Sequence, residues 1–214
     1  MNQNLTTIFA LAVACVTGTV QAQGDAKAAA SKVAMCIGCH GIEGYQASFP
    51  EVHKVPMISG QGAGYIAAAL TAYQKGDRKH PTMRSIANSL TEQDIADVAA
   101  FYEQQAPAGA AKPAREPSVQ VADLLKRGAC VSCHGDNFSK PIDPSYPKIA
   151  GQHADYLYVA LKSYKITNNP QLGRSNGVMA GIAQQFSSQE LKQLANYIGG
   201  LEGDLKTVPQ SKFR

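Results

Sequence analysis

The sequence predicts an all-α protein made of two tandem domains with the same helical plan. Apolar residues recur at three- and four-residue steps over segments of helical length, and no segment alternates as a strand would. The same segments occur twice, in the same order, along the 214 residues. A proline-rich stretch without periodicity, residues 106–118, separates the copies. We therefore expect domains over residues 23–105 and 119–214, joined by a semi-rigid, extended linker.

Residues 1–22 have the features of a secretory signal peptide. Leu5 to Val20 is nearly all apolar or small, and Val20-Gln21-Ala22 forms a small-x-small cleavage site. The first four residues carry no Lys or Arg, which leaves an uncleaved membrane anchor as the alternative. Because the apolar run is short for a membrane span, we expect export to the periplasm and removal of Cys15 with the signal.

Each domain is expected to hold three helices separated by irregular stretches. The expected helices cover residues 25–36, 65–75 and 91–105 in the first domain and 119–130, 155–165 and 187–199 in the second. The last helix of each domain begins with a capping-box pattern, Thr91-Glu92-Gln93-Asp94 and Ser187-Ser188-Gln189-Glu190. The long stretch between the middle and last helices is expected to be a loop.

One short motif occurs once in each domain, at a spacing of 94 residues. It is Cys36-Ile37-Gly38-Cys39-His40 in the first domain and Cys130-Val131-Ser132-Cys133-His134 in the second. C-x-x-C-H is the attachment signature of c-type haem, in which both thiols bind the vinyl groups and the histidine ligates the iron. The sequence therefore predicts two covalently attached haem c groups.

Two other kinds of protein site also use paired cysteines. A zinc site is the first alternative, but here each pair is followed directly by histidine and sits in its own copy of a helical repeat. A thioredoxin-like redox motif would need strands that the sequence does not show. Haem attachment at Cys36, Cys39, Cys130 and Cys133 accounts for the pattern best.

Met83 and Met179 are the expected sixth ligands of the two irons, opposite His40 and His134. The two methionines lie at equivalent repeat positions, 43 and 45 residues after their histidines. A thioether opposite an imidazole favours ferrous iron and leaves no open coordination site. That ligation suits electron transfer and opposes oxygen or peroxide chemistry.

Other residues compete for the sixth position, and a methionine can also serve only to pack a core. Met57 is a rival in the first domain, but Lys148 occupies its repeat position. His53 and His153 are rivals without repeat counterparts, and Asn176 replaces His80 in the second domain. These alternatives stay open at the level of sequence.

Four further residues are expected to support the haem ligands. A backbone carbonyl at Pro56 or Pro147 can accept a hydrogen bond from the second ring nitrogen of the haem histidine and so fix its orientation. Arg78 and Arg174, also matched in the repeat, can donate to haem propionates, although either could equally be a solvated charge.

Charge is divided unevenly between the halves of the chain. Residues 23–111 carry a net charge of −1 and residues 112–214 a net charge of +5. This asymmetry can orient a redox partner protein or a membrane surface. Nothing in the distribution suggests a nucleic-acid partner.

The chain resembles tandem class I cytochrome c domains, in particular those of the cytochrome c4 family. The resemblance spans about residues 25–200. It rests on both C-x-x-C-H motifs, the stretches Pro56-Met57-Ile58-Ser59-Gly60-Gln61 and Pro147-Lys148-Ile149-Ala150-Gly151-Gln152, the tyrosine-bearing middle helices, and the two matched methionines. It implies a periplasmic dihaem electron carrier whose lobes face each other about a pseudo-twofold axis, with the propionates near the interface. It further implies a respiratory donor, a terminal oxidase or similar acceptor, and loose, variable membrane association.

Sequence therefore predicts a relay protein without a small-molecule substrate of its own. The rival function is that of a dihaem enzyme, such as a dehydrogenase or peroxidase, or of the cytochrome subunit or electron acceptor of a dehydrogenase. A catalytic haem needs a displaceable ligand and nearby acid–base groups. Only Glu51, His53 and His153 are candidates, and they form no recognisable motif.

Overall fold

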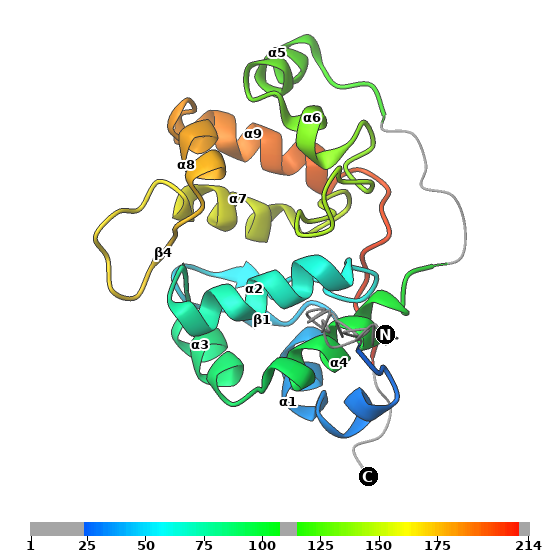
Figure 1. Ribbon diagram of the computed structural model, residues 1–214. Coiled ribbons are helices and arrows are strands. Elements are labelled where there is room, and N and C mark those ends of the chain that lie inside the picture. The colour runs from blue at the N-terminus through cyan, green and yellow to red at the C-terminus, as the bar shows by residue number, and fades with distance from the viewer. Residues whose placement is uncertain (1–23, 108–114, 210–214) are drawn as a thin grey trace, which may run out of the picture.

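The described part of the chain forms two helical lobes stacked on each other (Figure 1). The computed structural model describes residues 24–107 and 115–209. The expected signal segment, residues 1–22, and residues 108–114 of the expected linker lie outside the described residues. The predicted all-α architecture with two repeated lobes is confirmed.

The first lobe contains four α-helices, a 3₁₀ helix and three two-residue strands among the described residues. In chain order they are η1 (Ala28–Ser31), α1 (Ala34–His40), β1 (Gln46–Ala47), β2 (His53–Lys54), α2 (Ala63–Lys75), β3 (Arg78–Lys79), α3 (Pro81–Asn88) and α4 (Glu92–Glu103). Strands β1 and β2 pair antiparallel within the lobe. The structure thus has short strand pairs that the sequence pattern did not reveal, since two residues are too few to show alternation.

The second lobe repeats this plan from residue 115 onward. Its elements are α5 (Val119–Arg127), α6 (Cys130–His134), α7 (Ala154–Ser163), β4 (Gly173–Arg174), α8 (Gly177–Gln184) and α9 (Ser188–Gly199). Helices α2 and α7 lie at the level where the two lobes meet (Figure 1).

The helices that carry the C-x-x-C-H motifs differ from the prediction. The expected helix over residues 25–36 is a 3₁₀ turn followed by α1, which contains the whole first motif. The expected helix over residues 119–130 ends at Arg127, and α6 begins anew at Cys130. Ala129 between them has a φ of 47°, a left-handed conformation that breaks the helix.

Helices α3 and α8 were not predicted, so the expectation that Met83 and Met179 lie on loops is wrong. Each helix has only eight residues, too short for a clear apolar periodicity. Their start signals were nevertheless present: Pro81 is the first residue of α3, and Asn176 caps α8.

Both predicted capping boxes are confirmed. In α4, the Asp94 N–H donates to Thr91 Oγ1 at 3.1 Å, and the Thr91 N–H donates to Asp94 Oδ2 at 3.0 Å. In α9, Ser187 and Glu190 exchange the equivalent bonds at 3.3 and 2.7 Å. Each box satisfies two of the N–H groups that a helix start leaves unpaired.

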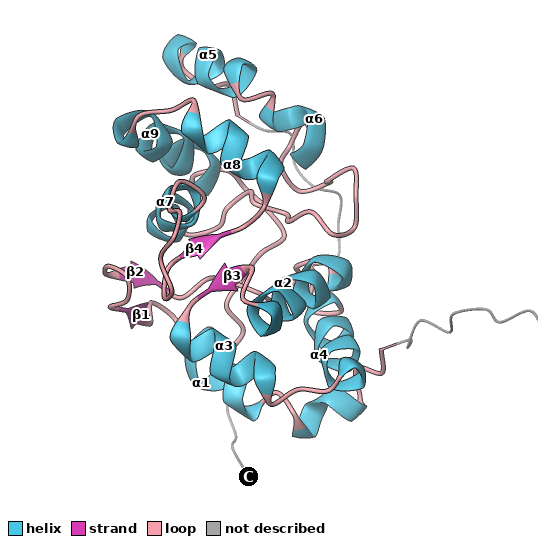
Figure 2. Cartoon of the chain, turned by 60° about the vertical axis from the view of Figure 1, so that its left-hand side comes forward, coloured by secondary structure: helices cyan, strands magenta, loops and turns pink. Residues whose placement is uncertain are grey.

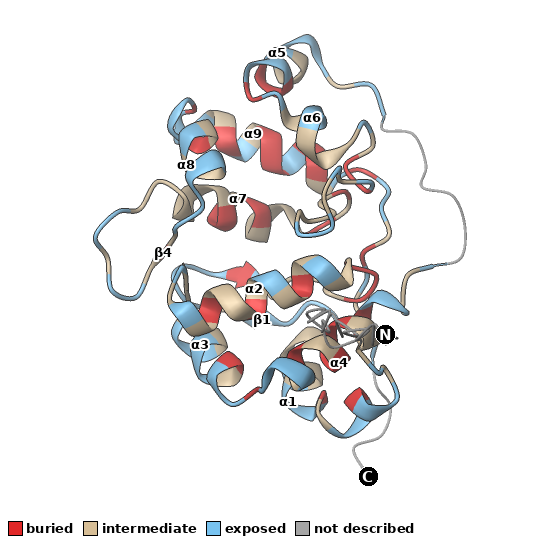
Figure 3. Cartoon of the chain, viewed as in Figure 1, coloured by how far each residue is buried: buried red, intermediate tan, exposed pale blue. Residues whose placement is uncertain are grey.

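Each lobe has its own hydrophobic core, and buried residues lie on helices of both lobes (Figure 3). In the first lobe the core lies between η1, α2, α3 and α4, and Ile66, Leu70 and Tyr102 are among its members. In the second lobe it lies between α5, α7 and α9 and includes Leu157 and Leu191. Cys36 and Met83 pack against the first core, and Cys130 packs against the second.

Strands from different lobes pair with each other. Strand β3 of the first lobe pairs antiparallel with β4 of the second, with Arg78 opposite Arg174 (Figure 2). Beyond α9 the chain returns to the first lobe, where the Lys206 N–H donates to the Ser59 carbonyl at 3.1 Å. Gly60 permits this approach, because a Cβ at that position would lie 2.3 Å from the Asp204 carbonyl oxygen. No helix in the described ranges is long and apolar enough to cross a membrane.

A buried carboxylate ties the start of the first lobe to α4. Asp97 is 2% exposed and accepts hydrogen bonds from Lys32 Nζ at 2.7 Å, the Asp25 N–H at 2.8 Å and Gln93 Nε2 at 2.7 Å. These donors hold the pKa of the Asp97 carboxyl below its usual range, with the Lys32 ammonium contributing most. The stabilisation is therefore present above the unfolded-state pKa of about 4 and is lost as the pH falls through the lowered folded-state pKa.

Replacing this carboxylate should flatten the acid dependence of stability. Asp97→Asn should lower the melting temperature of the holoprotein at pH 7. It should also make the fall in melting temperature between pH 5 and pH 2 smaller, because the amide cannot titrate. Thermal unfolding followed by circular dichroism measures both effects. Asp123→Asn, at an exposed position of α5, is the control and should leave the profile unchanged. Equal acid sensitivity in Asp97→Asn and the parent would contradict this assignment.

Candidate functional site

The motif cysteines and histidines of each lobe lie together on one short helix. Cys36, Cys39 and His40 are on α1, and Cys130, Cys133 and His134 make up α6 with two intervening residues. None of the four motif cysteines forms a disulfide. Burial raises the pKa of both Cys36 and Cys130 to about 11. Within the described residues, no three His, Cys, Asp or Glu side chains converge on a common metal position.

A backbone carbonyl orients each motif histidine. His40 Nδ1 lies 2.7 Å from the Pro56 carbonyl oxygen, and His134 Nδ1 lies 3.1 Å from that of Pro147. Burial lowers the pKa of both imidazoles, against the opposing effect of these carbonyls. The neutral ring therefore carries its proton on Nδ1, and the lone pair of the unprotonated Nε2 can ligate a metal.

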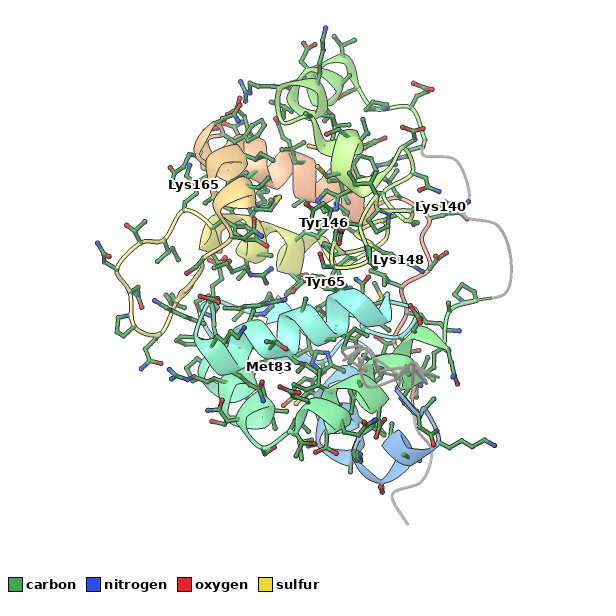
Figure 4. The ribbon with its side chains drawn as sticks, viewed as in Figure 1. Tyr65, Met83, Lys140, Tyr146, Lys148 and Lys165 are labelled. Atoms are coloured by element: carbon green, nitrogen blue, oxygen red, sulfur yellow. The ribbon has the colours of Figure 1, made fainter. Side chains whose placement is uncertain are left out.

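Met83 and Met179 occupy the same place in their lobes, the first turn of the short helix before the last one. Both side chains are half-buried (Figure 4 labels Met83). The Met83 N–H donates to His80 Nδ1 at 3.4 Å, and the Met179 N–H donates to Asn176 Oδ1 at 2.9 Å. His80 and Asn176 are thus equivalent helix caps, which explains why one replaces the other in the repeat.

Two of the four rival ligands, His53 and His80, use a ring nitrogen in another contact, and the contacts of Met57 lie on its backbone. Nδ1 of His80 faces the backbone of Met83 as a cap. His53 is 5% exposed, with Nδ1 2.8 Å from the Glu51 carbonyl oxygen and its ring 6.1 Å from that of Tyr156. His153 is the N-cap residue of α7. Met57 is bound through its backbone to Gln152 of the other lobe.

Arg78 and Arg174 meet at the lobe interface, where they are directly opposite partners in the β3–β4 pair. The Tyr156 hydroxyl lies 2.6 Å from one nitrogen of Arg78 and 3.1 Å from one of Arg174. Arg78 also donates at 3.0 Å to the hydroxyl of Tyr65, which lies on the side of α2 facing the second lobe (Figure 4). Although burial opposes the shift, the two guanidinium groups lower the pKa of Tyr156 to about 8.

This cluster has the charge and space to receive an anion. Within the described residues, neither guanidinium forms an ion pair with a carboxylate, and the buried Nε of Arg78 has no hydrogen-bond partner. A cavity of about 430 Å³ adjoins both arginines and is lined from both lobes. Paired positive groups without counter-charge are costly unless an anion joins them. An anionic group such as a carboxylate therefore fits this cluster.

Sequence reasoning missed several residues of this region. Tyr65 and Tyr156 were predicted only as part of apolar helix faces, whereas their hydroxyls hold the arginines. Gln61 and Gln152 were part of a matched repeat without an assigned role, and each crosses to the other lobe. Their identical repeat positions were the available signal, but a single chain sequence does not show which lobe a side chain faces.

Comparison with known proteins agrees with the two motifs and the repeated lobes. The family model for cytochrome c matches the chain twice, over residues 26–105 and 119–202. Cytochrome c4 from Azotobacter vinelandii is 31% identical over 94% of this chain and 100% of its own length. The thiosulfate dehydrogenase electron acceptor of Stutzerimonas stutzeri is 31% identical over 85% of this chain and 84% of its own length.

Solved structures agree as well. Reduced recombinant cytochrome c4 from Pseudomonas stutzeri has a TM-score of 0.61 and 28% identity over 84% of this chain and 100% of its own length. Two cytochrome c domains, each with its own C-x-x-C-H motif, carry two covalently bound haem c groups. The chain therefore belongs to the cytochrome c family, and within it to the dihaem electron-transfer proteins of the cytochrome c4 type.

Proposed function

We propose that the mature chain carries electrons between respiratory proteins in the periplasm, with no substrate turnover of its own. One observation supports this most: each lobe repeats the same set of a carbonyl-oriented histidine and a methionine at a capped helix start. Two such sets would supply a histidine and a methionine ligand to each haem iron and would leave no coordination site for a substrate. The chain's remaining task is to set potentials, the distance between the haems and docking.

We assign the covalent and axial bonds residue by residue. Cys36 and Cys39 bind the first haem and Cys130 and Cys133 the second. The axial pairs are His40 with Met83 and His134 with Met179. The haem supplies a one-electron iron couple, and the protein supplies a low-dielectric lobe around each of its two sites.

The supporting residues act on orientation and charge. The Pro56 and Pro147 carbonyls hold the histidine rings by their Nδ1 protons, which makes each imidazole a stronger ligand. Arg78 and Arg174 donate to the propionates at the lobe interface, where a planar guanidinium suits a carboxylate. Positive charge at this point favours the reduced iron of either lobe over the more positive oxidised form.

The proposed enzyme candidates are poorly arranged for catalysis. Glu51 contacts His53 through its backbone carbonyl, while its carboxylate forms an ion pair with Lys162 at 2.6 Å. His153 begins α7, and its side chain makes no cap hydrogen bond. Among the described residues, no hydrogen bond joins the side chains of Glu51, His53 and His153 into an acid–base pair. Acting as electron acceptor for a dehydrogenase, as the Stutzerimonas stutzeri relative is named, is the second candidate and is still a carrier function.

Removing either methionine should free the sixth coordination position of one haem iron. Met83→Ala and Met179→Ala should each convert half of the haem from low-spin to high-spin and allow one haem to bind carbon monoxide, because the thioether is lost. Absorption spectroscopy with carbon monoxide titration measures the fraction. Met57→Ala is the matched control and should keep both haems low-spin. A Met57→Ala chain that gains a carbon monoxide site, or a Met83→Ala chain that gains none, would contradict the ligand assignment.

A carrier and an enzyme also differ in turnover. The reduced holoprotein should pass electrons to membranes containing a terminal oxidase and be re-reduced by a periplasmic donor, with two electrons carried per chain. Thiosulfate or hydrogen peroxide added to the isolated chain should not be consumed catalytically. Stopped-flow absorption and substrate assays give both results, and multiple turnovers of either compound by the chain alone would overturn the proposal.

A further inference from the structure

Two glutamines cross the lobe interface in a reciprocal arrangement. Gln61 of the first lobe and Gln152 of the second are each 4% exposed and occupy the same repeat position. Gln61 Nε2 donates to the Lys148 carbonyl at 2.9 Å, and the Lys148 N–H donates to Gln61 Oε1 at 2.9 Å. Gln152 Nε2 donates to the Met57 carbonyl at 2.9 Å, and the Met57 N–H donates to Gln152 Oε1 at 3.0 Å.

Each glutamine binds the peptide unit that orients the haem histidine of the opposite lobe. The Met57 N–H and the Pro56 carbonyl belong to one peptide group, so that group accepts from His40 and donates to Gln152. In the second lobe, the Pro147 carbonyl accepts from His134, and the Lys148 N–H of the same peptide group donates to Gln61. Two chains of hydrogen bonds therefore run from a motif histidine, through one peptide, into the other lobe.

The surrounding backbone fixes both glutamines in place. Gln61 Oε1 also accepts from the Gly62 N–H, and Gln152 Oε1 from the His153 N–H, each at 3.0 Å. The preceding glycines, Gly60 and Gly151, have φ values of +86° and +73°, which a residue with a side chain rarely adopts. Lys148, labelled near the lobe boundary in Figure 4, adds a further hydrogen bond between the lobes beside Gln61. Its Nζ donates to the Gly60 carbonyl at 3.0 Å.

We propose that Gln61 and Gln152 are positioning residues that set the reduction potential of the haem in the opposite lobe. A peptide whose N–H is hydrogen-bonded has a more negative carbonyl oxygen, because the two bonds polarise each other. That carbonyl then accepts more strongly from Nδ1–H and makes the imidazole a better donor to oxidised iron. Intact glutamines therefore lower the potential of the haem across the interface. This inference rests on the axial roles proposed for His40 and His134.

The arrangement gives the matched Pro-x-Ile-x-Gly-Gln stretches a function as a unit. The proline at the start of each stretch orients the histidine of its own lobe, and the glutamine at the end supports the histidine of the other lobe. The two stretches form a cross-brace, so a change in packing between the lobes reaches both irons.

The test is a pair of crossed substitutions in the holoprotein. Gln152→Leu should raise the potential of the first-lobe haem, and Gln61→Leu that of the second-lobe haem. The expected change is about threefold in the reduction equilibrium constant, roughly 30 mV for one electron, from the loss of one peptide hydrogen bond. The hyperfine-shifted Nδ1 proton of the crossed histidine should also move in the NMR spectrum and assign each potential to its lobe.

A third glutamine serves as the matched control. Gln74 Nε2 donates to the Ala87 and Leu90 carbonyls within the first lobe and touches no histidine-bearing peptide. Gln74→Leu should therefore leave the potential and the histidine proton of the second-lobe haem unchanged. If Gln152→Leu yields no folded holoprotein, Gln152→Asn removes the same contact by shortening the side chain and should shift the first-lobe haem in the same direction.

The outcomes separate this inference from the proposed function. The inference is supported if both haems stay low-spin and each substitution shifts the reduction potential of the haem in the opposite lobe. Intact low-spin spectra with no shift, a shift in the glutamine's own lobe, or equal shifts of both haems in both variants would overturn it and leave the ligand assignment standing. Loss of histidine–methionine spectra in the unsubstituted protein would instead refute the proposed function.

Discussion

The hydrogen bond between a motif histidine and a proline carbonyl is the constraint on which much of this structure depends. The C-x-x-C-H helix of each lobe is short and its side chains are at most partly buried, so packing alone does not orient its histidine. The carbonyls of Pro56 and Pro147 do so from the irregular stretch that follows. Because proline has no N–H and a fixed φ, it suits a stretch whose backbone groups are used for such contacts.

The same stretches bring the two lobes together. Their far ends, Gln61 and Gln152, bind the other lobe, and the returning C-terminal segment pairs with Ser59. At the other side of the interface, Arg78 and Arg174 share the Tyr156 hydroxyl. The lobes are therefore joined by polar groups that lead back to the haem sites rather than by an apolar surface alone. Such an interface can couple two redox centres while each lobe keeps its own core.

The sequence predicts the parts of this structure that depend on local chemistry. The C-x-x-C-H motifs, the capping boxes at Thr91 and Ser187 and the middle helix of each lobe all follow from residues close together in the chain. The short helices α3 and α8 were not predicted from the sequence, because eight residues show little periodicity. The hydrogen bonds of Gln61 and Gln152 to the opposite lobe were not predicted for a different reason. They depend on the relative placement of two lobes, which no spacing within one lobe encodes.

In the proposed function, protein ligands close both irons, and each iron carries one electron. A spectropotentiometric titration of the mature holoprotein at neutral pH, repeated under carbon monoxide, tests it most directly. We predict two haems per chain, two one-electron steps, low-spin spectra in both oxidation states and no uptake of carbon monoxide. A haem that is high-spin, or that readily binds carbon monoxide without any substitution, would contradict the account.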